Sequence, residues 1–315
     1  MKDDGLRIMH QSVLLQEIVD GLGAKKGETI LDGTVGGGGH SEALCRSIGF
    51  GKFVCLDADE DAIERSRQRL EACGCEFLFS RTNYRHLDTA LERFGIAGVN
   101  RVLLDLGLSS FQLNPTAEGG SGRGFSFMRD EPLQMTFSKH PAEGELTATQ
   151  IVNEWSEDTL ATILESYGEE KQARRIARQI VEAREKTPIK TTLELVAIIE
   201  SVVKPARLNS RSGGRKGKIH PATKTFQALR MAVNDEFQAL KDGLTKAWEK
   251  LLPQGRIAVI SFHSIEDRTV KDFFRKLGKS GAGMVLTKKP ITPSPEEIKR
   301  NPRARSAKLR IIEKV

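Results

Sequence analysis

Alternation between short β-branched runs and helical patterns restricts the folds open to this chain more than any other feature of its sequence. Candidate strands lie at residues 28–35, 53–59, 76–84 and 99–107. Because helical patterns follow the first three of them, we predict a parallel sheet with helices on both faces. Two further runs, 284–289 and 307–314, are expected to close this sheet as a terminal antiparallel pair.

A long interval separates the fourth candidate strand from the next one, 255–263. The 147 residues between them are too many for a single crossover helix, so we predict an inserted second unit with helical periodicity. The predicted boundaries assign 1–112 and 215–315 to one domain and 113–214 to the insert. Residues 220–251 are predicted to form one long amphipathic helix that returns to the sheet.

The composition of the 315-residue chain is that of a globular protein. Hydrophobic residues make up 38% and charged residues 29%, which favours a packed core and excludes wholesale disorder. The apolar stretches are far shorter than the ~20 residues that cross a bilayer. Acidic residues stand where a signal peptide would have its apolar core, which favours a cytoplasmic protein.

Four cysteines, all in the first quarter of the chain, lack the paired spacing of a metal site. They are Cys45, Cys55, Cys73 and Cys75. We therefore expect reduced, mostly buried thiols and no bound metal.

Positive charge is concentrated in two acid-free stretches. The net charge is +7, and residues 205–230 and 299–310 contain basic side chains without a single acid. Either run alone is compatible with an ordinary solvated face. Two such runs favour a polyanionic partner, because lysine and arginine gain affinity by displacing counterions from phosphates.

A glycine-rich turn, 32–40, follows the first candidate strand and precedes a helix. Glycines at such a turn let the backbone approach a ligand closely, and the helix start can hold polar groups. The dinucleotide-binding fingerprint Gly-x-Gly-x-x-Gly has glycines at positions 1, 3 and 6. If Gly36 is position 1, position 6 is Ser41, so the turn does not match the fingerprint of dehydrogenases. The turn instead resembles the acidic-x-Gly-x-Gly-x-Gly turn of S-adenosylmethionine enzymes, with Thr34 in place of the first glycine.

Candidate ligand-binding side chains follow the later strands. Asp57, at the end of the second strand, is suited to accept hydrogen bonds from both ribose hydroxyls of an adenosine. It could instead cap a helix. Tyr84 could pack beside the adenine ring or lie at the core rim. Asp105 ends the fourth strand, where ligands collect in doubly wound sheets, but a buried capping carboxylate is the alternative. His263, at the edge of the fifth strand, is a catalytic candidate or a structural histidine.

Seven sequence blocks together resemble the family of ribosomal RNA small subunit methyltransferase H. They are HQSVLLQE (10–17), DGTVGGGGHS (32–41), LLDLGLSS (103–110), RGFSF (123–127), HPATKTFQALRMAVNDE (220–236), SFHSIEDR (261–268) and NPRARSAKLR (301–310). Their order and spacing are far more specific than the glycine turn alone.

This resemblance implies an α/β class I S-adenosylmethionine-dependent methyltransferase fold. Such a fold is Rossmann-like, with a mostly parallel seven-stranded sheet, and here carries an inserted α-helical domain. The two terminal segments would bind S-adenosylmethionine and the insert would recognise the substrate. The implied reaction is methylation of N4 of a cytidine in the decoding region of 16S rRNA, in the small ribosomal subunit. The implied enzyme acts in the cytoplasm as a monomer or homodimer.

The resemblance also carries over individual residues. The cofactor contacts fall on Gly38, Gly39, His40, Asp57, Tyr84, Asp105 and Gln112. Asp105 and His263 are the catalytic candidates, and Asp105 or a nearby backbone carbonyl would accept an amino N–H of the cytosine. The chain departs from the family pattern at Ser12, where proline is usual, and at Gln134 and Thr136, where Asp and Arg are usual.

Two rival functions remain open from the sequence. One is a methyltransferase of the same fold that acts on a protein or a small molecule, which the basic runs disfavour. The other is an RNA-binding assembly factor without catalytic activity, which the glycine turn, Asp57 and Asp105 disfavour.

Overall fold

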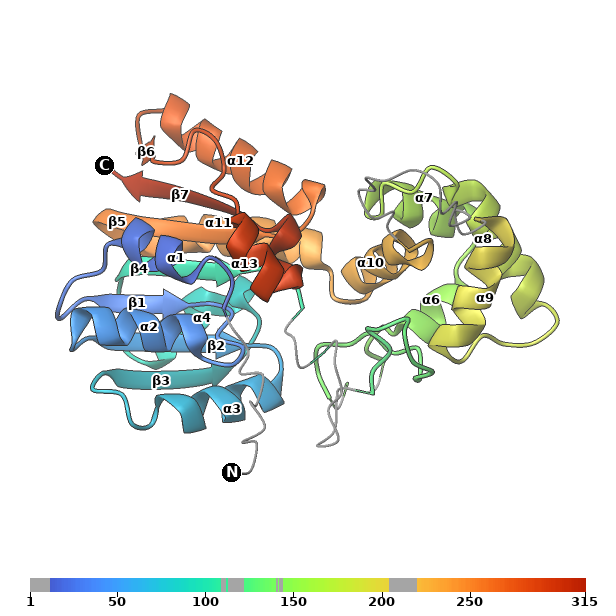
Figure 1. The fold of residues 1–315 in the computed structure, drawn as a ribbon, viewed down its shortest axis with the longest axis horizontal. Coiled ribbons are helices and arrows are strands. Elements are labelled where there is room, and N and C mark those ends of the chain that lie inside the picture. The colour runs from blue at the N-terminus through green and yellow to red at the C-terminus, as the bar shows by residue number, and fades with distance from the viewer. Residues whose placement is uncertain (1–11, 109–111, 113–121, 140, 142–143, 204–219) are drawn as a thin grey trace. The chain divides into compact units, whose positions relative to one another are not determined.

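The computed structural model describes residues 12–108, 112, 122–139, 141, 144–203 and 220–315 (Figure 1). The chain folds into two compact units. The first comprises Met1–Ser109 and Phe237–Val315, and the second comprises Ser110–Glu236. The second unit thus runs from Ser110 to Glu236, whereas the sequence prediction placed the insert at 113–214.

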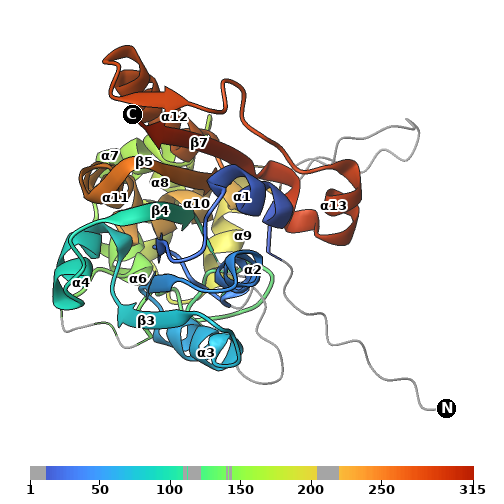
Figure 2. The same ribbon diagram turned by 90° about the vertical axis from the view of Figure 1, so that its left-hand side faces the viewer.

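The first unit contains a seven-stranded sheet in the order β3-β2-β1-β4-β5-β7-β6. Its strands are β1 (Thr29–Asp32), β2 (Lys52–Asp57), β3 (Glu76–Arg81), β4 (Val99–Asp105), β5 (Leu251–Ser261), β6 (Gly283–Val285) and β7 (Lys308–Lys314). The first five strands of that order run parallel to one another, whereas β7 is antiparallel to both β5 and β6. Figure 2 shows β3, β4, β5 and β7 one above another. This is the predicted mostly parallel sheet of a class I methyltransferase fold.

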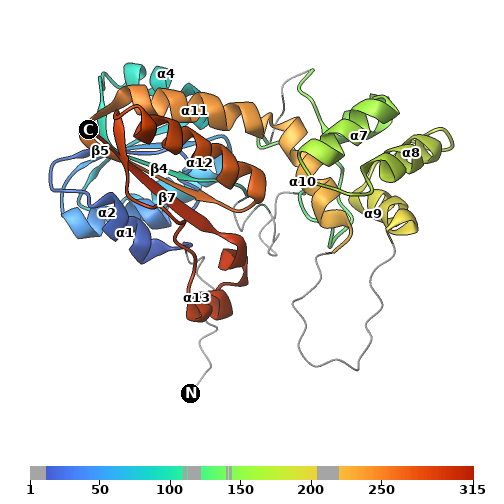
Figure 3. The ribbon, with the colours of Figure 1, turned by 90° about the horizontal axis from the view of Figure 1, so that it is seen from above.

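Helices cover both faces of the sheet (Figure 3). One layer consists of α1 (Leu15–Leu22), α2 (Gly39–Ile48) and α3 (Glu60–Leu70), and the other of α4 (Leu87–Arg93), α11 (Glu236–Lys250) and α12 (Ser264–Lys279). Successive strand residues therefore enter opposite cores: Ile30 packs under the first layer and Leu31 under the second. Burial on both faces explains why the strands read as continuous apolar runs. The remaining short elements are η1 (Tyr84–His86), α13 (Pro295–Arg300) and η2 (Pro302–Ser306).

The second unit is helical in the part that the structure describes. It contains α6 (Ala148–Glu154), α7 (Glu157–Ser166), α8 (Ala173–Arg184), α9 (Thr192–Val202) and α10 (Ala222–Val233). Capping boxes start two of these helices, through Thr147 with Gln150 and through Thr191 with Glu194. Because such caps satisfy amide groups that the helix itself leaves unpaired, the sequence marks these helix starts locally.

The single helix predicted over 220–251 is interrupted between α10 and α11. Asp235 adopts a left-handed φ of 46°, and the preceding Asn234 turns its side chain to a distant loop. The Asn234 amide donates to the carbonyl of Met135 at 2.8 Å and accepts from the backbone N–H of Phe137 at 2.9 Å. These bonds join residues almost a hundred positions apart, so helical periodicity could not reveal the break.

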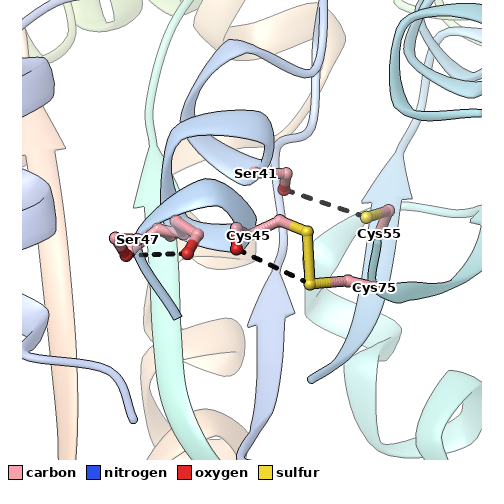
Figure 4. The surroundings of a disulfide bond; sticks show 6 residues. Ser41, Cys45, Ser47, Cys55 and Cys75 are labelled. Carbon is pink, nitrogen blue, oxygen red and sulfur yellow. Dashed lines mark hydrogen bonds between the residues drawn. A yellow bond between two sulfur atoms is a disulfide. The ribbon is translucent and has the colours of Figure 1, made fainter. Parts of the chain in front are cut away.

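The expectation that all cysteines are reduced was wrong. Cys45 in α2 and Cys75 just before β3 form a disulfide (Figure 4). Cys55 and Cys73 are free. Cys45 belongs to the core under α1, α2 and α3, and the partly buried Cys75 packs against that core. Their Cα atoms are 6.0 Å apart, a normal disulfide separation. Sequence spacing missed the pair because 30 positions separate the two residues.

Among the described helices, none combines the length and apolar composition that a bilayer crossing requires.

Candidate active site

Three aspartates end three neighbouring parallel strands of the first unit. Asp57 is the last residue of β2, Asp32 of β1 and Asp105 of β4. The strand order changes direction between β1 and β4, so these carboxylates collect where ligands bind in open α/β sheets.

Asp57 is held by two backbone amides. Its Oδ2 accepts from the N–H of Gly36 and its Oδ1 from the N–H of Asp59, both at 2.9 Å. A carboxylate oxygen can accept more than one hydrogen bond, so both oxygens keep capacity for hydroxyl donors. Burial raises the pKa of Asp57 to about 6, and the charges of Asp59 and Asp32 add to this. The helix-capping alternative for Asp57 is wrong, because Asp59 is the residue that caps α3.

The glycine turn has the backbone geometry that its composition indicated. Gly36 and Gly38 have φ values of 53° and 76°, in the left-handed region that favours glycine. Gly39 is required by packing, since a Cβ there would lie 2.2 Å from Oγ of Ser12. The N-cap residue of α2 is Gly38, which has no side chain to cap the helix that begins at Gly39. The turn therefore directs an uncapped helix start towards this edge of the sheet.

Asp32 and Thr34 fix the first part of the turn against β4. Asp32 accepts hydrogen bonds from the N–H of Thr34 at 3.2 Å and from Oγ of Ser41 at 2.6 Å. Thr34 Oγ1 in turn accepts from the N–H of Asp105 at 2.6 Å. Burial raises the pKa of Asp32 to about 6. A glycine at position 34 would lack the hydroxyl that makes this link.

His40 and Asp105 lie beside each other. His40 Nδ1 is 3.7 Å from Oδ2 of Asp105, and its Nε2 is 2.9 Å from the carbonyl oxygen of Val13. A carbonyl only accepts, so Nε2 carries the proton of that bond. His40 thereby connects the segment before α1 to the end of β4.

Asp105 is the most strongly perturbed of the three aspartates. Burial raises its pKa to about 8, and the carboxylates of Asp32 and Glu266 contribute to this increase. About a quarter of its side-chain surface remains accessible, yet its Oδ1 is buried and has no hydrogen-bond partner among the described residues. An unpartnered buried acceptor is uncommon in folded proteins and fits a site that receives a donor from a ligand.

Tyr84 lies between the glycine turn and α11. It begins η1, shortly after β3. Added Cβ atoms at Gly33 and Gly243 would lie 3.1 Å from the Cβ and 2.5 Å from the ring of Tyr84, respectively. The two glycines thus provide room for the Tyr84 side chain. One edge of its ring packs against α11 at the rim of the core, which is the second of the two placements considered for Tyr84 from the sequence. A contact with adenine stays a prediction.

His263 has a structural role in the described chain. It caps α12 in a capping box with Glu266: its Nδ1 accepts from the Glu266 N–H at 3.4 Å, and its Nε2 is 3.1 Å from Glu266 Oε1. The sequence placed it correctly after β5, but its catalytic role stays a prediction. Gln112 is buried and belongs to the second unit, so its predicted cofactor contact also stays a prediction.

Sequence reasoning did not select three residues of this site: Asp32, Thr34 and Glu266. Asp32 and Thr34 carried a usable signal, because both belong to the turn that follows β1. Glu266 carried none, since its influence on Asp105 arises where α12 starts near the edge of the sheet.

Comparison with known proteins gives a consistent result. The sequence profile of the MraW methylase family matches residues 7–315. Ribosomal RNA small subunit methyltransferase H of Persephonella marina is 42% identical over 308 residues, which cover 98% of this chain and all of that protein. The protein of the same name from Koribacter versatilis is 45% identical over 306 residues, covering 96% of this chain and 92% of its own length.

The third relative, ribosomal RNA small subunit methyltransferase H of Finegoldia magna, is 38% identical over 326 residues, covering 98% of this chain and all of its own. Among solved structures, an rRNA methylase from Streptococcus thermophilus aligns over 98% of this chain and 99% of its own, with 10% identity and a TM-score of 0.41. With a family profile that spans nearly every residue and relatives that match end to end, this chain belongs to the MraW methylase family.

Proposed function

We propose that this protein uses S-adenosylmethionine to methylate N4 of a cytidine in the decoding region of 16S rRNA. Methyl transfer from S-adenosylmethionine follows from the family and from the fold. A small subunit rRNA as the substrate is supported by relatives named for that activity. The single observation that carries the proposed chemistry is the buried Oδ1 of Asp105 at the carboxyl end of β4, which has no hydrogen-bond partner among the described residues.

The residues at this edge of the sheet fit the cofactor. Asp57 retains acceptor capacity on both oxygens for the ribose hydroxyls, and Gly36 and Asp59 hold it in place. Gly38 and Gly39 bring an uncapped helix start to the same edge. S-adenosylmethionine supplies, when bound, a methyl group already activated by its sulfonium.

The protein must then position a weak nucleophile, because the amino lone pair of cytosine is delocalised into the ring. In this proposal Asp105 Oδ1 accepts an amino N–H of the base and takes up the proton as positive charge develops on N4. A raised pKa makes the Asp105 carboxylate a stronger base than an ordinary aspartate. Thr34 and His40 flank Asp105 from two sides and keep it in position.

The two basic runs provide less support for RNA binding than the sequence suggested. In the second run, Lys308 and Arg310 pair with Asp267 at 3.1 and 2.6 Å and hold β7 to α12. Lys299, Arg300 and Arg305 of that run remain exposed. Most of the first run, including Arg211, Arg215 and Lys216, lies outside the described residues.

A cationic surface that the sequence analysis did not select lies at the start of α8. It consists of Lys171, Arg174, Arg175 and Arg178, which we call the α8 stripe. All four side chains are exposed, and their helical spacing places them on one face, opposite the buried Ile176 and Ile180. Arg174 and Arg175 lie in the first turn of α8, where positive charge opposes the helix dipole, whereas Arg178 is 3.5 Å from Oε1 of Glu157. Helix stability therefore does not explain the positions of Arg174 and Arg175, which favour an external anion.

Nucleoside mapping of 16S rRNA tests the proposed function. Cells that lack this protein should lose N4-methylcytidine from the decoding region, and the wild-type gene should restore it. The Asp105→Asn variant should not restore it, whereas the control Asp20→Asn, an exposed position on α1, should. Unaltered N4-methylcytidine in the deleted strain would overturn the proposal, and purified small subunits that accept no methyl group would point to another acceptor.

A further inference from the structure

The RGFSF block (123–127) contains residues that stabilise its own loop and an aromatic residue, Phe127, that is only partly buried. The block lies in the loop 122–131 of the second unit, and hydrogen bonds close this loop at its base. The Gly124 N–H donates to Oε2 of Glu131 at 2.9 Å, and the Met135 N–H donates to the carbonyl of Arg123 at 2.6 Å. A Cβ on Gly124, whose φ is 76°, would lie 2.5 Å from a backbone oxygen. Gly124 therefore serves the close approach of two chain segments.

Arg123 and Phe125 also serve the fold. Both are buried. The guanidinium of Arg123 donates to the carbonyl of Phe137, and the Phe125 ring stacks on the Phe137 ring with centroids 5.9 Å apart. These contacts account for the first three residues of the block without any ligand.

Phe127 differs from them, because it is only partly buried and contacts another block of the sequence. Its ring stacks on His220 with centroids 4.6 Å apart and an interplanar angle of 16°. It also meets the buried Phe226 edge to face at 5.4 Å. The two blocks RGFSF and HPATKTF, which the sequence separates widely, thus meet through aromatic rings.

The His220 ring is held in a fixed orientation. Its Nδ1 accepts the N–H of Ala222 at 3.2 Å, which leaves the proton on Nε2, 3.4 Å from Oε1 of Glu200. About 36% of the His220 side chain is nevertheless exposed. The next residue after Phe127, Met128, is 76% exposed. The ring pair is thus nearly parallel and held in place, and its His220 ring remains partly open to solvent.

We infer that Phe127 and His220 form a stacking platform for an unpaired nucleobase of the substrate RNA. This inference rests on the proposed function, because it requires RNA as the substrate. Proteins recognise unpaired bases by stacking them on aromatic and histidine rings, since every base has a flat π-face. His220, anchored at both ring nitrogens and packed on Phe127, loses little conformational freedom when a base stacks on it.

The alternative is that the ring pair only fastens the loop 122–131 to α10. A base-stacking platform and a loop fastener predict different affinities of a ring variant for RNA that lacks one base. If the rings stack a base, then removing the ring and removing the base abolish the same interaction, and the two effects are not additive. If the rings only hold the loop, loss of the ring weakens binding of every RNA equally.

Fluorescence anisotropy with the full-length protein tests this inference. The probe is a labelled single-stranded RNA of roughly 16 nucleotides with the decoding-region sequence, together with a series in which each nucleotide in turn is abasic. His220→Leu removes the ring on which the base stacks and should weaken binding of the intact RNA roughly 5- to 150-fold, the loss typical of one stacked base. Phe127→Leu removes the ring that supports His220 and should weaken binding in the same direction. Either substitution should have little effect on one member of the abasic series, which identifies the stacked base. Phe127→Trp should retain the affinity.

Phe125→Leu is the matched control, because it removes a buried ring from the same loop. It should leave the discrimination between intact and abasic RNA unchanged. Thermal unfolding and S-adenosylmethionine affinity show that each variant is folded. The stacking platform is overturned if His220→Leu or Phe127→Leu binds the intact RNA with wild-type affinity, or if either loses the same affinity for every abasic RNA. If the wild-type protein still methylates small subunits in that case, the proposed function remains intact. Wild-type protein that neither binds RNA nor methylates small subunits overturns both.

Discussion

Thr34 Oγ1 accepts a hydrogen bond from the backbone N–H of Asp105 at 2.6 Å, and this bond ties the turn after β1 to the end of β4. The same threonine donates its own N–H to Asp32. Asp105 therefore depends for its position on a residue that stands where the related turn of S-adenosylmethionine enzymes has glycine.

Replacing Thr34 tests this dependence. Thr34→Val removes the hydroxyl and leaves the Asp105 N–H without its acceptor, which should cost about 1 to 3 kcal/mol of stability. Because Asp105 is displaced, kcat should fall more than KM rises. Thr34→Ser should restore both, and Thr162→Val, which removes an exposed helix hydroxyl, is the control. Equal kcat for Thr34→Val and wild type would show that the bond does not position Asp105.

Asp57 should contribute directly to cofactor affinity. Asp57→Ala removes an acceptor that two backbone amides hold towards the ligand edge, so S-adenosylmethionine binding should weaken by about 1 to 3 kcal/mol. Isothermal titration calorimetry measures this change directly. Asp20→Ala, an exposed position on α1, should bind the cofactor like wild type. Unchanged affinity of the Asp57 variant would remove this residue from the cofactor site.

Activity should increase with pH through a midpoint near 8 and level off above it. The pKa of Asp105 is raised to about 8, so the carboxylate that accepts the amino proton predominates only above that pH. Asp32→Asn removes one of the charges that raise this pKa and should move the ascending limb of kcat to lower pH. A limb at the same pH in both proteins would assign the titration to another group.

Stability should respond to the same proton in the opposite direction. Folded Asp105 keeps a proton up to about pH 8 that the unfolded chain releases near its ordinary value of 3.8. The unfolded state then binds fewer protons, so the free energy of unfolding decreases as pH rises between these values. Urea unfolding at several pH values should show a weaker decrease for Asp105→Asn. An identical pH dependence would mean that the Asp105 pKa is not raised.

The disulfide should stabilise the first unit. Closure of the 30-residue interval between Cys45 and Cys75 restricts the unfolded chain and corresponds to about 3 to 4 kcal/mol in the chain-entropy treatment. A reductant should lower the free energy of unfolding of the wild type but not of Cys45→Ala. Cys73→Ala, which removes a free thiol, should still respond to the reductant. An intact mass that corresponds to four free thiols would contradict the bridge.

The α8 stripe should contribute to the salt dependence of RNA binding. Replacing Arg174, Arg175 and Arg178 by glutamine should reduce the slope of log K against log salt. The expected reduction is about 0.7 for each phosphate of single-stranded RNA that the variant no longer neutralises. Cofactor affinity should not change.

The control for the α8 stripe replaces three exposed lysines of α12, namely Lys271, Lys276 and Lys279. These substitutions remove as much positive charge from the first unit, so they separate a local effect from a change in net charge. An unchanged slope in the α8 variant, or an equal decrease in the control, would exclude a specific role of the stripe.

Much of this fold and site could be predicted from local sequence. The strands of the first unit are short, and helices bury both of their faces, which produces apolar runs that the sequence displays openly. Asp57 and Asp105 could be placed because each follows such a run, and the carboxyl ends of parallel strands share one edge. Gly36 and Gly38 could be identified because their left-handed conformation favours a residue without a side chain.

Other features depend on contacts between distant residues. The basic run 299–310 was predicted to favour a polyanionic partner, but β7 directs Lys308 and Arg310 onto Asp267 of α12. Likewise, Asn234 ends α10 because its amide binds a loop that lies almost a hundred positions earlier.

The order of strands and helices, the glycine turn and the family were determined by the sequence alone, since each depends on residues that are close together along the chain. Only the tertiary structure decided that Cys45 meets Cys75, that Phe127 stacks on His220 and that Asp105 keeps an oxygen with no hydrogen-bond partner among the described residues. The physical reason is that disulfide formation, ring stacking and desolvation act across space. Their partners are therefore set by how the elements pack.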